Sequence, residues 1–345
     1  MNARATQTEP RSTRRRVFLG ALALGALLVV PGAGCGGEPS PAEIPSGYSP
    51  KLGQAFESAA AGLDIRDASA GAVPRWSAPP EDCELRYRYR AMTDIGAGEL
   101  ASEESTQLHT WWEEGDWTAS DLRGAMRLNL RHRHGDLRDG VYESSSGVGD
   151  ETLQLKSPRG RAWVETSQVS EIWTDFGMWS GVNEYFPPLP ESDAALEVSL
   201  PLRGGANDKT RALDLPTPRA EAMPTRIELF RWIEVAGQRA AVIRSRYAYS
   251  GGSELLGYSD PESGCGLSRT IKLEGEAQYV VLESGILLHA EIREEIVQGV
   301  GNVILGGAFT SPIRSEARLV AGCGQPELAD FPELPGAGPM PEAQL

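Results

Sequence analysis

Residues 270–297 read TIKLEGEAQYVVLESGILLHAEIREEIV and contain the clearest alternation of apolar and polar side chains in the chain. Two alternating runs joined by a Ser-Gly pair are typical of a β-hairpin, here with its turn around Ser284-Gly285. Both arms exceed the roughly five to six residues of an average strand, so we expect this hairpin to curve, with Gly275 as a candidate bend. Its apolar face comprises Ile271, Leu273, Ala277, Tyr279 and Val281, facing Ile286, Leu288, Ala290 and Ile292.

The same alternation extends in both directions from this hairpin. Residues 226–235 and 239–249, with a turn around Ala236-Gly237, predict a second hairpin, and residues 315–320 predict a last strand. Toward the N-terminus, four apolar positions from Leu85 to Ala91 alternate with charged ones, as in a half-buried strand. Further strands are predicted at 107–112, 117–122, 125–134, 152–156 and 161–165, with turns at 114–116 and 158–160.

These patterns predict a mostly β protein, built as one antiparallel, largely meandering sheet of about ten to thirteen strands, strongly curved or half-barrelled. The single β domain is expected over residues 81–323. Before it, residues 35–80 are expected to provide a flexible tether up to Ser49 and then a short helix. The helix has one apolar face, made of Leu52, Phe56, Ala59, Ala60 and Leu63. The acidic, Pro-rich residues 324–345 predict a disordered tail.

The first 34 residues have the composition of an export signal. A basic stretch, Thr13-Arg14-Arg15-Arg16-Val17-Phe18, leads into an apolar run that ends at Val30 and is followed by small residues. This run is shorter than the roughly 20 residues that a permanent membrane-spanning helix needs. The pattern therefore favours processing of the segment over a lasting transmembrane anchor.

This N-terminus resembles a bacterial twin-arginine-type lipoprotein signal peptide. The resemblance rests on the arginine stretch and on Ala33-Gly34-Cys35, which is similar to the end of a lipobox, although Gly32 stands where that family usually has Leu. It implies that Cys35 is acylated, becomes the mature N-terminus and anchors the protein to the cell envelope. Within the same resemblance, Gly36 in place of Asp favours the outer membrane, at its periplasmic or surface face, over the inner membrane. The alternative is an ordinary cysteine after a plain cleavage site.

The charge of the mature chain excludes some partners. The chain has 33 Lys+Arg and 48 Asp+Glu, and residues 1–34 hold five of the basic and one of the acidic residues. The mature part then has 28 basic and 47 acidic residues, a net charge of −19. Nucleic acids and anionic headgroups need a positive surface, so we expect neither as a partner.

Three cysteines remain once Cys35 is assigned to lipid. In an oxidising compartment Cys83, Cys265 and Cys323 predict one disulfide and one leftover thiol. The expected strand order disfavours the pair Cys265–Cys323, but the sequence does not choose among the pairings. The chain has no CxxC motif, so a redox or cysteine–zinc site has no support.

Motifs for catalysis are weak. His132 and His134 lie on one face of a predicted strand and are candidate metal ligands, but Arg131 and Arg133 flank them and would repel a cation. Adjacent acids such as Glu113-Glu114 and Glu294-Glu295 are expected on opposite strand faces or in solvent. The chain contains no phosphate-binding, zinc-protease, nucleophile-elbow or dinucleotide-binding pattern. We therefore expect a non-catalytic protein without a cofactor.

An aromatic segment near residues 170–190 is the strongest candidate for ligand contact. It is too irregular for a strand, and it could form a lid over a curved sheet that contacts a hydrophobic ligand. The alternative is a plug that caps the protein's own core. The candidate ligand-binding residues are Trp173, Phe176, Met178, Trp179, Tyr185 and Phe186.

The order of long hairpins behind an acylated cysteine loosely resembles the LolA/LolB-like periplasmic carriers, which hold acyl chains in an open β half-barrel. This resemblance is one of architecture, and it transfers no binding residue. Three functions remain open: an envelope lipoprotein that binds a lipid or another hydrophobic molecule, a structural or protein-interaction lipoprotein with an unidentified envelope partner, and a metal-dependent enzyme using His132 and His134.

Overall fold

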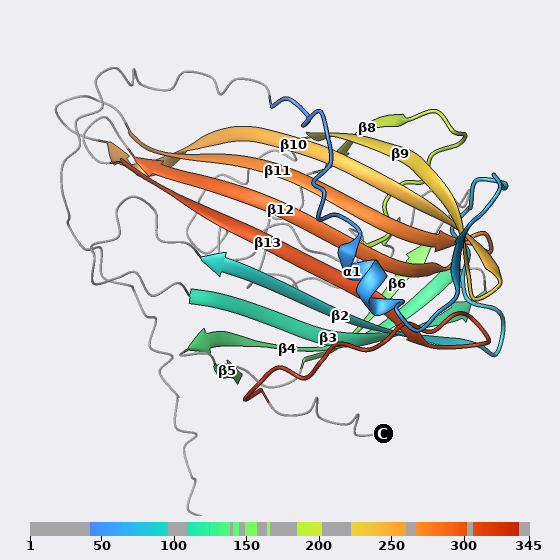
Figure 1. The fold of residues 1–345 in the computed structure, drawn as a ribbon. Coiled ribbons are helices and arrows are strands. Elements are labelled where there is room, and N and C mark those ends of the chain that lie inside the picture. Colours follow the sequence, from blue (N-terminus) through green and yellow to red (C-terminus); the bar gives the residue numbers. More distant parts are fainter. Residues whose placement is uncertain are drawn as a thin grey trace, which may run out of the picture.

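A computed structural model describes residues 42–95, 109–123, 125–138, 141–144, 149–156, 164–165, 185–201, 222–259, 266–301 and 306–337. In these residues thirteen strands form one antiparallel sheet, which confirms the predicted mostly β fold (Figure 1). Cys35 and Cys265 lie outside the described residues, as do Trp173, Phe176, Met178 and Trp179.

The sheet runs in the order β1-β9-β10-β11-β12-β13-β2-β3-β4-β6-β7, with β8 beside β9 and β5 beside β4. Within the described residues its two ends do not pair with each other, so the sheet is open. Most strands pair with the next strand in sequence. Pairings between strands that are not consecutive include β1 with β9, β4 with β6, and β13 with β2, which joins the C-terminal half to the N-terminal half. The strands are β1 (Ile65–Asp67), β2 (Glu84–Ile95), β3 (His109–Leu122), β4 (Ala125–Arg138), β5 (Val141–Ser144), β6 (Gly149–Lys156), β7 (Val164–Glu165), β8 (Leu196–Pro201), β9 (Ala222–Val235), β10 (Gln238–Ser259), β11 (Gly266–Leu282), β12 (Leu287–Gly301) and β13 (Gly306–Ala321).

The two predicted C-terminal hairpins are confirmed. β11 and β12 pair with Ala277 opposite Ile292 and Tyr279 opposite Ala290, so the predicted apolar faces meet. β9 and β10 are joined at Ala236 and Gly237, which both have positive φ. Two-residue turns of this kind need positive φ at both central positions, because their twist then matches that of the flanking strands.

One predicted turn is wrong. Glu114-Gly115-Asp116 lies in the middle of a continuous strand, β3, instead of between two shorter strands. Gly115 serves a packing role there, because a methyl group at this position would overlap the ring of Tyr89 on the neighbouring strand. Glu114 and Asp116 point to the opposite face, where arginines neutralise them. A pattern typical of a turn therefore reflects cross-strand contacts.

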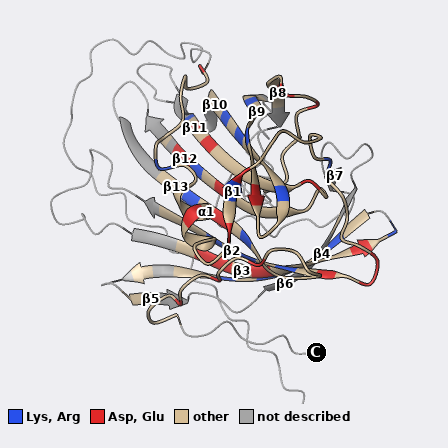
Figure 2. Ribbon diagram, turned by 45° about the vertical axis from the view of Figure 1, so that its right-hand side comes forward, with Lys and Arg blue, Asp and Glu red and all other residues tan. Residues whose placement is uncertain are grey.

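The two faces of the sheet differ in chemistry. The inner face, which we define by Tyr87, Tyr89 and Trp117, carries the main hydrophobic core. The outer face, defined by Arg88 and Arg90, carries rows of charged side chains. Figure 2 shows the sheet curving from β9 and β10 round to β4, as expected for a half-barrel.

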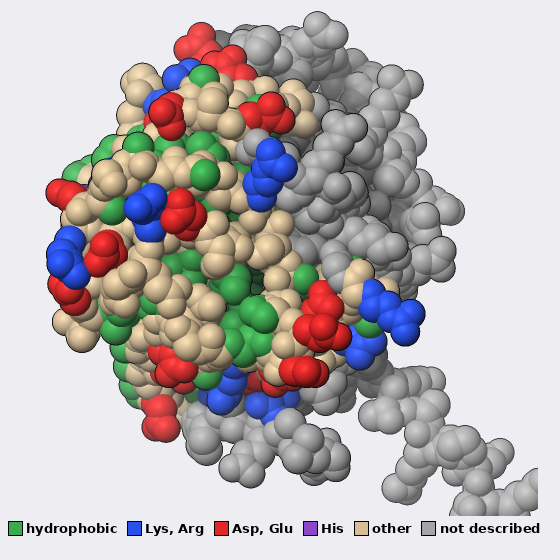
Figure 3. Space-filling view, turned by 90° about the vertical axis from the view of Figure 1, so that its right-hand side faces the viewer, with side chains coloured by type: hydrophobic (Ala, Val, Ile, Leu, Met, Phe, Trp, Pro, Cys, Tyr) green, Lys and Arg blue, Asp and Glu red, His purple; other side chains and the backbone are tan. Residues whose placement is uncertain are grey.

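The predicted helix and a loop cover parts of this sheet. Helix α1 (Gln54–Ala59) is confirmed and lies over β12 on the outer face, with Phe56 and Ala59 buried (Figure 1). At the inner face, Trp76 donates a hydrogen bond to the carbonyl of Pro187, which ties the loop before β2 to the segment before β8. Figure 3 shows this end of the sheet, where apolar side chains gather between charged ones.

Both segments expected to be flexible pack against the outer face in the part that the structure describes. Leu328 and Leu334 are buried, so the predicted disordered tail is wrong for residues 324–337. Likewise, the backbone N–H of Ser49 donates to Glu276 and the carbonyl of Pro45 accepts from Arg246, so the end of the predicted tether is also fixed. Proline and acidic residues suggest disorder in sequence, but here arginines of the sheet bind their backbone.

Cys83 and Cys323 form a disulfide across 240 residues of sequence. Both cysteines lie where β2 begins and β13 ends, and these two strands are neighbours. The pairing agrees with the expectation that Cys265 and Cys323 are not partners.

No helix in the described part of the chain is long and apolar enough to cross a membrane.

We expect the double substitution Cys83→Ser/Cys323→Ser to lower the free energy of unfolding by about 4 to 5 kcal/mol, because the crosslink restricts a very long loop in the unfolded chain. Urea denaturation of both forms measures this difference. A reducing agent should produce a similar loss in the parent protein. An unchanged midpoint in the double variant would contradict a stabilising role.

Candidate functional site

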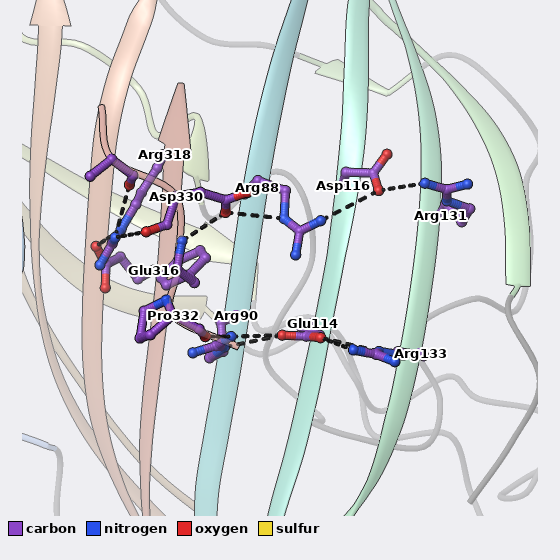
Figure 4. Close-up of polar contacts among 12 residues, drawn as sticks. Arg88, Arg90, Glu114, Asp116, Arg131, Arg133, Glu316, Arg318, Asp330 and Pro332 are labelled. Carbon is purple, nitrogen blue, oxygen red and sulfur yellow. Dashed lines mark hydrogen bonds and ion pairs between the residues drawn. The ribbon is translucent and has the colours of Figure 1, made fainter. Parts of the chain in front are cut away.

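Among the residues that the structure describes, an extensive polar arrangement lies on the outer face of β13, β2, β3 and β4. Alternation along each strand places every second side chain on this face, and the register aligns the charged ones across strands. Arg90 lies opposite Glu114, which lies opposite Arg133, while Arg88 lies opposite Asp116. We call the five arginines of this region, namely Arg88, Arg90, Arg131, Arg133 and Arg318, the arginine surface (Figure 4).

Two carboxylates each bridge neighbouring strands. Glu114 accepts hydrogen bonds from Arg90, at 2.8 Å, and from Arg133, at 2.5 Å. Asp116 accepts from Arg131 at 3.0 Å and lies 4.0 Å from Arg88 (Figure 4). Glu114 is only 2% exposed, so these pairs are largely removed from water. Charges in this setting are held firmly, since breaking one pair leaves a buried charge without compensation.

The electrostatics of the carboxylates agree with this geometry. Burial alone would raise the pKa of Glu114, but hydrogen bonds from Arg133 and Arg90 outweigh burial and hold that pKa below its usual value. The pKa of Glu316 is also lowered, because hydrogen bonds from His289 and Arg318 outweigh the effect of burial. Both carboxylates therefore stay ionised at neutral pH and fix the arginines beside them.

The arginine surface holds the C-terminal segment, residues 324–337, mainly through that segment's backbone. Arg318 donates to the carbonyls of Ala329 and Asp330, and Arg90 donates to the carbonyl of Pro332 at 2.8 Å. Farther along, Arg133 donates to the carbonyl of Ala337. Four carbonyl oxygens of this segment are thus bound by three arginines of the sheet.

Side chains of the C-terminal segment add two further contacts. The carboxylate of Asp330 lies 3.3 Å from Nε of Arg88. The ring of Phe331 lies under two guanidinium groups, 4.0 Å from Arg318 and 4.8 Å from Arg90. Arginines bind aromatic faces in this way because the ring quadrupole attracts the cation. The surface therefore contacts an acidic and an aromatic side chain that are adjacent in sequence.

The N-terminal segment, residues 42–60, is bound by similar chemistry over β10, β11 and β12. The guanidinium groups of Arg244 and Arg246 lie over the ring of Tyr48, and Arg246 donates to the carbonyl of Pro45. The backbone N–H of Gly53 donates to Glu291 at 2.8 Å. The outer face thus holds two segments, one on each half of the sheet.

The inner face carries two buried carboxyl groups. Tyr89 donates to Glu113 at 2.6 Å, and Tyr247 donates to Glu294 at 2.5 Å. Neither carboxyl takes part in an ion pair within the described residues. Desolvation by burial raises the pKa of each to about 7, although the tyrosine hydrogen bond acts in the opposite direction. The expected solvent exposure of these acids is therefore wrong, while Glu113 and Glu114 do face opposite sides.

Gly275 allows Tyr247 to reach Glu294. The register places Tyr247 opposite Gly275 on β11, and Gly275 opposite Glu294 on β12. The tyrosine ring lies over the glycine, and a methyl group at position 275 would overlap it. The predicted bend at Gly275 is therefore better explained by this close approach of an aromatic ring across one strand.

The structure describes two of the candidate ligand-binding residues. Tyr185 and Phe186 are buried in the main core, with ring centroids 5.3 Å from Trp117 and 5.4 Å from Trp76, respectively. These two rings therefore pack against the sheet, as the plug alternative expects. Trp173, Phe176, Met178 and Trp179 lie outside the described residues.

The histidines do not form a metal site in the described residues. His132 and His134 lie on the inner-face side of β4, next to Gly115 and Glu113 of β3 in the register, and both are partly buried. No group of three or more potential ligands is present in the described part of the chain. His289 is fully buried and is hydrogen-bonded to Glu316 at 2.8 Å.

Sequence reasoning missed the arginine surface, although part of its signal was visible. Arg88 and Arg90 alternate with tyrosines in one strand, and Arg131 and Arg133 alternate with histidines in another. Such alternation is also typical of a solvated strand face, so it did not indicate that charged residues would be covered. The covering segment was not recognisable because its contacts use backbone carbonyls.

Comparison with known proteins gives no identification, since no family model and no curated protein matches the chain.

The buried carboxyl groups of Glu113 and Glu294 on the inner face should make the stability of the protein depend on pH. Their folded pKa of about 7 exceeds the ordinary value of 4.5, so the folded chain keeps protons that the unfolded chain releases. Stability from this source is complete below about pH 4.5 and is lost as pH rises through 7. We expect the free energy of unfolding to fall between about pH 5 and 8, by up to about 3 kcal/mol per carboxyl.

Urea denaturation at several pH values measures this slope, and Glu113→Gln should reduce it because the amide does not titrate. Stability that rises over the same range would contradict the assignment of raised pKa values to these two groups.

The substitution Gly275→Ala should lower the free energy of unfolding by about 1 to 3 kcal/mol, because the added methyl displaces the Tyr247 ring. In a Tyr247→Ala background the same change should cost much less. A double-mutant cycle measured by denaturation tests this coupling. Additive effects of the two substitutions would show that ring and glycine do not interact.

Proposed function

We propose that this protein is a non-catalytic, lipid-anchored protein of the cell envelope that serves as a protein-interaction module. The anchor is an acyl group on Cys35, as the N-terminal resemblance implies. The interaction role is supported by one observation above all: the arginine surface binds an extended polypeptide segment through backbone carbonyls, a carboxylate and an aromatic ring.

This chemistry is of the kind that recognises protein segments. Guanidinium groups offer several donors in a fixed plane, and they bind both carbonyls and aromatic faces. A surface with five arginines is unusual in a chain whose formal net charge is −15, so it is a local feature and not a consequence of composition. The packing of Tyr185 and Phe186 against Trp117 and Trp76 also favours a filled core at that end of the sheet.

A second candidate function is the binding of a lipid or another hydrophobic molecule at the inner face. The open sheet and the two buried pairs, Tyr89–Glu113 and Tyr247–Glu294, favour it, because protonated carboxyls could bind a polar group within an apolar site. Trp173, Phe176, Met178 and Trp179 would be the apolar contacts in this case.

Native mass spectrometry of the exported protein, with organic extraction and lipid analysis, tests the two functions against each other. A Cys35→Ser variant serves for this measurement, because the attached acyl group would otherwise dominate the lipid signal. We expect the mass of the bare polypeptide without a co-purifying lipid. A stoichiometric lipid retained by the variant would favour the carrier and contradict our first choice.

Cell fractionation tests the anchor independently. The parent protein should remain with membranes. After signal processing, Cys35→Ser should move to the soluble envelope fraction, because it has no cysteine to carry the anchoring acyl chains. Membrane retention of Cys35→Ser after signal processing would contradict anchoring through this cysteine.

A further inference from the structure

We propose that the arginine surface is a binding site for an extended acidic–aromatic segment of a partner protein, and that residues 326–337 occupy it when the partner is absent. The occupant is defined by the chemistry of this resident segment: an acidic residue followed by an aromatic residue and then proline, in extended conformation. This inference gives the partner class for the proposed interaction role and rests on that role, but it does not depend on the lipid anchor.

The sheet itself fixes the arginines. Glu114 orients Arg90 and Arg133, Asp116 orients Arg131, and Glu316 accepts a 2.6 Å hydrogen bond from Nε of Arg318 (Figure 4). None of these acceptors belongs to the C-terminal segment. The donors that face the segment are therefore positioned by the strands, and they remain in place when the segment leaves. Preorganisation of this kind lowers the entropic cost of binding a new segment.

Charge complementarity favours an acidic occupant. The five arginines of the surface and the three carboxylates that orient them, Glu114, Asp116 and Glu316, leave a net charge of +2 in a strongly acidic protein. The resident segment reads PELADFPELPGA over residues 326–337 and has three carboxylates and no basic residue. Opposite charges steer association and penalise basic segments.

The resident segment does not use all the donors of the surface. Nε and Nη1 of Arg131 are buried and have no hydrogen-bond partner within the described residues. Nε of Arg88 is also buried without a hydrogen bond, since it meets Asp330 only as an ion pair at 3.3 Å. Buried guanidinium donors without acceptors are costly. A partner segment with a carboxylate or carbonyl at Arg131 would gain a contact that the resident segment lacks.

The recognition tolerates different sequences. Four of the contacts are to backbone carbonyls, at Ala329, Asp330, Pro332 and Ala337, and a carbonyl is present whatever the side chain. Selectivity then comes from two adjacent side chains, the carboxylate of Asp330 and the ring of Phe331. A partner needs to reproduce only this pair in order to compete for the surface.

The test uses a fluorescent synthetic peptide with the sequence of residues 326–337 and the exported full chain. Binding is followed by fluorescence anisotropy. In the parent chain, the resident segment competes with the added peptide for the arginine surface. In the variant Asp330→Ala/Phe331→Ala, the resident segment lacks its two side-chain contacts and competes less. We expect measurable binding to the parent and at least tenfold tighter binding to the variant. Adding Arg90→Ala to the variant should weaken binding at least tenfold, since the carbonyl and ring contacts are lost together.

Arg127→Ala is the matched control. Arg127 lies on the same face of β4 but is exposed. Adding Arg127→Ala to Asp330→Ala/Phe331→Ala should leave the affinity for the peptide within about twofold. Thermal unfolding shows whether the variant is folded. A variant that is folded and still fails to bind the peptide would overturn the proposal. Binding that Arg90→Ala leaves unchanged would do so too.

Hydrogen exchange on the parent protein separates a site open to partners from one reserved for its own segment. The amides of Leu328 and Ala329 donate to the carbonyls of Leu319 and Ala59, so both exchange slowly while the segment is bound. Excess peptide should accelerate their exchange. Unchanged exchange at saturating peptide, with binding seen only in the variant, would show that the surface serves only its own segment, and it would overturn this proposal. A stoichiometric lipid in the mass-spectrometric measurement is a different outcome, which would contradict the proposed interaction role itself.

Discussion

The carboxylate of Glu114, held between Arg90 and Arg133 on the two flanking strands, represents the constraint on which the outer face depends. A charge that is 2% exposed must be compensated, so three strands are locked into one register by a single acid. The same arginines then have donors left for the backbone of residues 324–337. Strand pairing, charge compensation and the binding of a peptide segment are thus consequences of one arrangement.

The two faces compensate their charges in opposite ways. On the outer face, hydrogen bonds from Arg133 and Arg90 keep Glu114 ionised, and hydrogen bonds from His289 and Arg318 keep Glu316 ionised. The covering segments are bound there by ionic and carbonyl contacts. On the inner face, Glu113 and Glu294 meet tyrosine hydroxyls and titrate near neutrality. On the inner face, protonation neutralises the carboxyl groups, whereas on the outer face neighbouring cationic side chains compensate their charge. The sheet therefore separates a permanently charged surface from one whose charge depends on its surroundings.

Sequence patterns predicted the fold well because alternation depends on local geometry. The hairpins of β9 to β12, the helix face around Phe56 and the opposite orientations of Glu113 and Glu114 all follow from periodicity. Contacts over long sequence distances were not predictable. Gly115 was mistaken for a turn residue because Tyr89, which needs the space above it, comes from another strand. Residues 324–337 were mistaken for a disordered tail because composition does not reveal that arginines of distant strands would bind their carbonyls.

The pairing of β13 with β2 has a consequence for how this sheet can form. The strand that completes the sheet around β2 is made of residues 306–321, so it follows almost the entire domain in the order of synthesis. Until then one edge of β2, with its row of backbone donors and acceptors, has no native neighbour. Exposed edges of this kind promote association with other chains, and closing very long loops is slow. A newly made chain therefore passes through a stage in which the edge of β2 is exposed, and this stage ends only when β13 pairs with it.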